Sequence, residues 1–97
     1  MKINEQLFAG LDINSLLTFL VVYQERCVSR AALRLKVNQS AVSNTLAKLR
    51  HRFDDFLFVR SGRGVHPTQR AFEIAQSLLP AFLLIQEVLP TAEVLRS

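Results

Sequence analysis

Four short polar residues stand close together near the middle of the chain, at Gln39, Ser40, Ser43 and Asn44. If this segment is helical, spacings of three and four residues place them on one face. Glutamine and asparagine amides can form paired hydrogen bonds with adenine, and serine hydroxyls can both donate and accept. These four residues are therefore candidates for contacting base edges in the major groove of a duplex.

The segment around these residues is strongly basic. The chain of 97 residues has a net charge of +4, but the stretch from Arg26 to Arg70 holds ten basic residues and only two acidic ones, Asp54 and Asp55. Concentrated positive charge attracts polyanions and speeds their capture. The alternative is a solvated face that only keeps the protein in solution.

Two helices are expected before the polar face. Apolar residues at helical spacing predict a helix over 13–25, with Asp12 or Asn14 as its N-cap. A short second helix follows, with Ser29 as the candidate cap. Lys36 and Val37 then form a tight turn, and we expect Val37 to be inserted into the core.

The polar face belongs to a third helix. Asn38 is its expected N-cap, and Val42, Leu46, Leu49 and Phe53 form its buried stripe at spacings of four, three and four. The pair Asp54-Asp55 is expected to cap and end this helix rather than to do acid–base chemistry.

A small hairpin is predicted next. Residues 57–60 are strand formers, residues 61–64 form a glycine-containing turn with Arg63 at its tip, and residues 65–66 return as the second strand. An arginine at a hairpin tip suits the minor groove, where narrow A·T tracts concentrate negative potential.

The last element is a long apolar helix. Thr68 is its expected N-cap, Pro80 predicts a bend and Pro90 an end. A helix this apolar is not expected to stay bare in a monomer, so we expect dimerisation through it. The alternative is that it folds back wholly on its own core. The expected dimerisation residues are Ala75, Leu78, Leu79, Phe82, Ile85 and Leu89.

This order of elements predicts a mainly α fold, a winged helix-turn-helix with a three-helix core and a hairpin wing. The expected organisation is a leader over 1–11, the DNA-binding domain over 12–67, a linker and dimerisation helix over 68–90, and a tail over 91–97. Side chains around the base-contacting face are expected to meet DNA phosphates: Ser29, Arg30, Asn38, Lys48, Arg50 and Arg60.

Residues 12–79 resemble the N-terminal DNA-binding domain of LysR-type transcriptional regulators, and in particular the NodD/LeuO-like branch. The matching runs are Ser29-Arg30-Ala31-Ala32, the segment 37–43, Leu57-Phe58-Val59-Arg60, Gly62-Arg63-Gly64 and Pro67-Thr68. The resemblance implies a homodimer on double-stranded DNA at a partly palindromic promoter site, with Gln39, Ser40, Ser43, Asn44 and Arg63 at the bases.

The sequence departs from the family pattern at several positions. Ser40 stands where many members have proline, Asp54 where many have glycine, and Cys27 where serine is usual. We expect Cys27 to be a small buried residue rather than a redox sensor. Members also carry an effector-binding domain of about 200 residues. These 97 residues do not include one, so no small-molecule ligand is expected here.

Other function classes find little support. No stretch of 18 apolar residues indicates a membrane span, and the only histidines, His51 and His66, lie on different expected elements. We expect a cytoplasmic protein with no metal site, no cofactor and no enzymatic activity. Two alternatives stay open: a helical module that binds another protein through its last helix, and a different class of winged helix.

Overall fold

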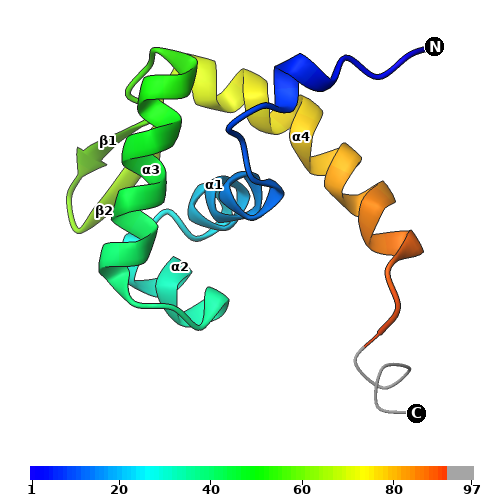
Figure 1. The fold of residues 1–97 in the computed structure, drawn as a ribbon. Coiled ribbons are helices and arrows are strands. Elements are labelled where there is room, and N and C mark those ends of the chain that lie inside the picture. Colours follow the sequence, from blue (N-terminus) through cyan, green and yellow to red (C-terminus); the bar gives the residue numbers. More distant parts are fainter. Residues whose placement is uncertain (92–97) are drawn as a thin grey trace.

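The computed structural model describes residues 1–91, so the expected tail, 91–97, lies outside the described residues except for its first residue. The elements, in chain order, are η1 (Glu5–Phe8), α1 (Ile13–Glu25), α2 (Val28–Leu35), α3 (Gln39–Phe53), β1 (Phe58–Ser61), β2 (Gly64–Pro67) and α4 (Gln69–Val88). This is the winged helix-turn-helix with a long last helix that the sequence predicted (Figure 1).

The core forms where α1 meets the other helices and the base of the wing. Phe19 and Val22 of α1 are almost completely buried, and the Phe19 ring packs against the tilted ring of Phe58 of β1 with centroids 5.4 Å apart. Small residues at Ala31 and Ala32 let α2 approach closely. The remaining buried residues are Leu20, Val21, Val42, Leu46, Leu49, Leu57, Ala71 and Ala75.

The helix boundaries confirm most of the expected caps and correct one. Asp12 Oδ1 accepts from the backbone N–H of Asn14 at 2.8 Å, and α1 ends at Arg26, which is left-handed with φ 57°. The N-cap of α2 is Cys27, whose side chain makes no capping bond, so Ser29 is not the cap. Ser29 lies in the first turn of α2 because the helix begins two residues earlier than expected.

The turn between α2 and α3 is tight but leaves its apolar residue outside. Lys36 is left-handed at φ 60°, and the Val37 N–H donates to the Ala32 carbonyl at 3.0 Å. The Val37 side chain is 46% exposed, so the expectation that it enters the core is wrong. Asn38 caps α3 as predicted, because its Oδ1 accepts from the Ala41 N–H at 2.8 Å.

The two glycines of the wing have different roles. β1 and β2 pair antiparallel with Ser61 opposite Gly64, which leaves a two-residue loop. Gly62 has φ 59°, a conformation that favours glycine. Gly64 does not have a positive φ. Instead, a Cβ atom there would overlap the Arg26 carbonyl, which also accepts from the Val65 N–H at 3.0 Å. The hairpin is thereby fixed to the end of α1.

Helix α4 begins at the wing and runs away from it. Thr68 Oγ1 accepts from the Ala71 N–H at 3.1 Å, and the helix continues through Pro80. Figure 1 shows its axis bending between its yellow and orange parts. By length and composition α4 could cross a membrane, but its Ala71 and Ala75 are packed in the core of the domain.

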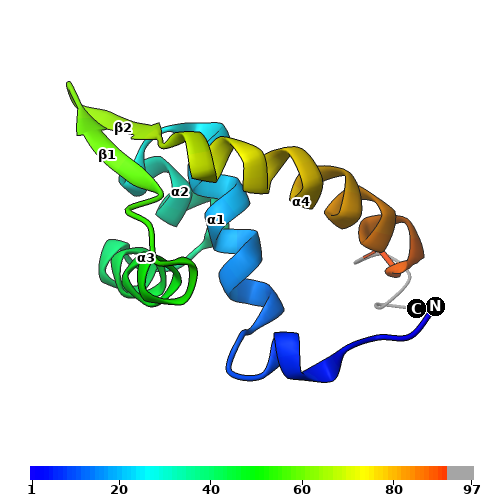
Figure 2. The same ribbon diagram turned by 90° about the horizontal axis from the view of Figure 1, so that it is seen from above.

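The wing and α3 lie on one side of the domain, and the second half of α4 extends from the other side (Figure 2). A ligand that contacts both α3 and the hairpin tip would therefore leave the end of α4 accessible.

Candidate nucleic-acid interface

The polar face of α3 points to solvent. Gln39, Ser40, Ser43 and Asn44 are all exposed, while Val42, between them in sequence, is buried. Within residues 1–91 none of these four side chains forms a hydrogen bond with another residue. Their donors and acceptors are thus available to a ligand that presents a complementary pattern, such as base edges in a major groove.

The cations around this face are also available. Arg30, Lys48, Arg50, Arg60 and Arg63 are exposed. In the part of the chain that the structure describes, the one ion pair joins Arg34 to Glu25 at 3.1 Å, which leaves these five without an acidic partner. Exposed cations without an acidic partner are available to neutralise the phosphates of a DNA backbone.

Two of the residues expected at phosphates are already engaged. Asn38 uses its side-chain oxygen to cap α3. Ser29 is half-buried, and its hydroxyl lies 3.1 Å from the Cys27 thiol. The backbone N–H groups of Ser29 and Arg30 at the start of α2 face the Cys27 sulfur, whereas those of Gln39 and Ser40 at the start of α3 have no partner within residues 1–91 and can meet an anion.

Cys27 is half-buried rather than buried, which corrects that expectation. The hydrogen bond with the Ser29 hydroxyl lowers the pKa of its thiol, and the backbone N–H of Arg30 adds to this effect.

Asp55 connects the end of α3, the wing and α4, a role that the sequence reasoning missed. One of its oxygens accepts from the Leu57 N–H at 2.8 Å and from the Thr68 hydroxyl at 2.7 Å. These two bonds, with the positive charge of Arg70, lower the pKa of the carboxyl group. The pair Asp54-Asp55 also ends the helix as expected, because Asp54 is left-handed at φ 52° and the Asp55 N–H donates to the Arg50 carbonyl at 3.2 Å. Asp55 and Thr68 are 13 residues apart, so no local pattern signalled the contact.

Arg52 holds the leader, residues 1–11, against α3. Its Nη1 donates to the Ala9 carbonyl at 2.6 Å and its Nη2 to the Leu7 carbonyl at 2.5 Å. The partners are more than forty residues away in sequence, and no local pattern predicts the contact.

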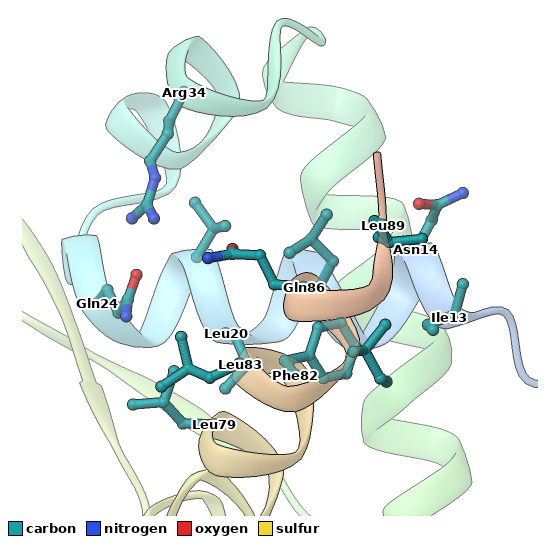
Figure 3. Close-up of a pocket in the computed structure, with 13 residues that line it drawn as sticks. Ile13, Asn14, Leu20, Gln24, Arg34, Leu79, Phe82, Leu83, Gln86 and Leu89 are labelled. Carbon is teal, nitrogen blue, oxygen red and sulfur yellow. The ribbon is translucent and has the colours of Figure 1, made fainter. Parts of the chain in front are cut away.

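An apolar groove of about 320 Å³ runs between α1 and the second half of α4. In Figure 3, Leu20, Leu79, Phe82 and Leu83 line its middle, and Gln24 lies toward one end. Several residues expected at a dimer seam are in or near this groove: Leu79, Phe82, Ile85 and Leu89.

Part of the expected seam serves the chain's own core. Ala75 is 3% exposed, and its burial in the monomer removes it from the set available to a partner. Leu78, Leu79 and Phe82 are half-buried against the same core, whereas Leu89 is 61% exposed.

The sequence matches a known family over most of this structure. Residues 13–71 match the model of bacterial regulatory helix-turn-helix proteins of the lysR family. The transcriptional regulator LeuO of Escherichia coli is 48% identical over 80 residues, which are 82% of this chain and 26% of that protein. The regulator YidZ of Salmonella newport is 50% identical over 69 residues, 71% of this chain and 22% of its own length. The chain thus spans about a quarter of these relatives.

Solved structures share the fold. A probable transcriptional regulator of Pseudomonas aeruginosa, PA0477, superposes with a TM-score of 0.80 at 40% identity, over 84% of this chain and 28% of that one. The BenM DNA-binding domain in complex with catB site 1 DNA gives a TM-score of 0.74 at 21% identity, over 79% of this chain and 86% of that one. At that identity the second likeness concerns the fold alone.

Proposed function

This chain belongs to the lysR family of bacterial helix-turn-helix regulators, and on that premise we propose that it binds double-stranded DNA sequence-specifically. In this proposal the first two turns of α3 enter the major groove, and Gln39, Ser40, Ser43 and Asn44 contact bases. Arg63, at the tip of the wing, lies at the minor groove. Transcription regulation by the whole protein, in the cytoplasm and without enzymatic chemistry, is part of the same proposal.

The observation that carries the proposal is the free polar face of α3. An exposed helix face in an ordinary domain mixes both charge signs, but the stretch from Arg26 to Phe53 has seven basic residues and no acidic one. The four polar side chains on that face have no partner within residues 1–91. A module that only binds protein through α4 does not need such a face.

A gel shift across a salt series tests DNA binding directly. Six phosphate contacts predict a slope of log affinity against log salt of about −5, because each neutralised phosphate releases about 0.9 of a counterion. If the protein selected no duplex from a random pool, the alternative would be favoured, a helical module that binds another protein.

Paired alanine variants test the division between base and phosphate contacts. Ser43→Ala and Asn44→Ala should each lose about 1–3 kcal/mol at one or two base positions and change the selected sequence. Lys48→Ala should weaken all sites alike and lower the salt slope by about one. Uniform weakening by all three variants would place the base-contacting face elsewhere.

We also propose that two copies associate through α4, at a partly palindromic site. The helix leaves a large apolar surface open, because Leu89 is 61% exposed and the neighbouring groove is lined mainly by aliphatic side chains. Exposed patches of this kind on a small domain mark an interaction surface. The remaining seam is Leu78, Leu79, Phe82, Ile85 and Leu89.

Two Leu→Asp variants at the same end of α4 form a matched test of this seam. Leu89 and Leu84 are almost equally exposed, at 61% and 65%, but only Leu89 lines the groove. Light scattering should show Leu89→Asp shifted toward monomer and Leu84→Asp still dimeric like the parent. A monomeric parent, or a loss of dimer with Leu84→Asp alone, would contradict the seam.

A further inference from the structure

The leader lies outside the segment that matches the family model, which begins at residue 13. It is nevertheless fixed to α3. Its short helix η1 is capped by Asn4, whose side chain accepts from the Gln6 N–H at 3.2 Å, and its last residues are held by Arg52. A charged guanidinium that donates to two carbonyls in a fork holds this segment more firmly than one bond would.

The contact creates a basic notch beside the exposed face of α3. The notch, with a volume of about 470 Å³, is lined by Gly10, Ala47, Lys48, His51 and Arg52. Two of these residues are basic, Lys48 and Arg52, one is a histidine, and none is acidic. Gly10 has φ 73°, and its N–H has no hydrogen-bond partner within residues 1–91. A phosphate group suits a surface that combines cations with a free backbone donor.

The notch lies along the same face as the base-contacting residues. His51 follows Asn44 by seven residues, two helical turns, which displaces it about 10 Å along the axis. Helix α3 has 15 residues and is therefore about 22 Å long, while the major groove is about 12 Å wide. A helix that crosses the groove with its first two turns at the bases extends past the groove edge with its last turns, where the sugar–phosphate backbone lies.

We propose that the leader and the second half of α3 form a binding site for a backbone phosphate beside the half-site, with Lys48, His51 and the Arg52-held Gly10 turn around it. This inference rests on the proposed DNA binding and extends it. The leader then belongs to the DNA-binding surface, and the contact adds affinity without adding base preference.

Gly10 allows a matched pair of variants. A Cβ atom there meets Arg52 Nη1 at 3.7 Å, an ordinary contact, and asparagine and aspartate both tolerate a left-handed backbone. Gly10→Asn and Gly10→Asp therefore have the same shape and differ in charge. The aspartate variant places a carboxylate beside Arg52 and makes the notch repel phosphate.

The test measures binding to a 40-base-pair mixed-sequence duplex over a salt series, with melting temperatures as a check on folding. We expect Gly10→Asn to bind like the parent. Gly10→Asp should bind about 3–10-fold more weakly at low salt, with a salt slope smaller by about one, as for one lost phosphate contact. Lys2→Gln, a change of one charge on the leader outside the notch, should leave the slope unchanged.

The outcomes separate this inference from the function on which it rests. Equal affinities and slopes for Gly10→Asn and Gly10→Asp would overturn the notch while leaving DNA binding intact. Equal weakening of both would also overturn it, since the effect would then be one of shape. A parent protein that binds no duplex at any salt would instead refute DNA binding itself.

Discussion

Replacing Gly64 by alanine should detach the wing from the body of the domain. A Cβ atom at this position would overlap the Arg26 carbonyl oxygen. This oxygen belongs to the backbone at the end of α1, where the Arg26 N–H donates to the Val22 carbonyl at 2.8 Å. Neither the end of α1 nor the hairpin backbone can shift without a cost in free energy. The hairpin must therefore move outward and lose the bond from the Val65 N–H to the same carbonyl.

The size of the effect follows from these two losses. Forcing an extra carbon into a packed contact costs about 1–3 kcal/mol, and a lost backbone hydrogen bond costs about 0.5–1.5 kcal/mol. We expect Gly64→Ala to lower the free energy of unfolding by about 2–4 kcal/mol. In a domain of this size each kcal/mol lowers the melting temperature by about 4–8 °C.

Gly62→Ala is the control within the same loop. Gly62 has a positive φ, but a Cβ atom there meets nothing within 4 Å, so alanine costs only the backbone term of about 1–2 kcal/mol. Urea unfolding should rank the parent, Gly62→Ala and Gly64→Ala in falling stability. Hydrogen exchange of the Val65 amide should accelerate most in Gly64→Ala. If Gly64→Ala proved as stable as Gly62→Ala with a protected Val65 amide, the close approach would not constrain the wing.

Three further predictions concern the elements that position α3. Asp55→Asn should destabilise the domain at pH 7, because the pKa of the native carboxyl group is lowered and its ionised form stabilises the fold above the ordinary pKa of 3.8. The urea midpoints of variant and parent should converge as the pH falls below 3.8. A difference between the two midpoints that stayed constant down to about pH 3 would contradict the assignment. Asn38→Ala should cost about 1 kcal/mol of unfolding free energy in urea titrations, as the loss of an N-cap does, whereas an unchanged midpoint would show that the cap bond contributes nothing. Val37→Ser should change the free energy of unfolding by less than about 0.5 kcal/mol, since the Val37 side chain is 46% exposed. Val42→Ser, at a buried site, should cost several times more. Similar thermal midpoints for the two variants would refute this difference.

Local patterns predicted most of the secondary structure because they depend on neighbours along the chain. The spacing of apolar residues predicted the observed bounds of α1, 13–25. The short polar side chains at Asp12, Asn38 and Thr68 marked the starts of α1, α3 and α4. Ser29 failed as a cap because capping depends on where the backbone leaves the extended region, and that residue is Cys27.

The sequence also predicted the polar face of α3, since side chains three and four residues apart share a face in any helix. The apolar spacing of Val42, Leu46 and Leu49 indicated that these three residues are buried. The opposite face of the helix must then be exposed, and that face carries Gln39, Ser40, Ser43 and Asn44.

Tertiary structure alone decided the contacts between segments far apart in the chain. The sequence could not show that Gly64 approaches Arg26, that Asp55 joins the end of α3 to Thr68, or that Arg52 holds the leader. It also could not divide the apolar stripe of α4 between the chain's own core, which takes Ala75, and the open groove that Leu89 lines. Periodicity shows which face of a helix is apolar, whereas what covers that face depends on how the helices pack in three dimensions.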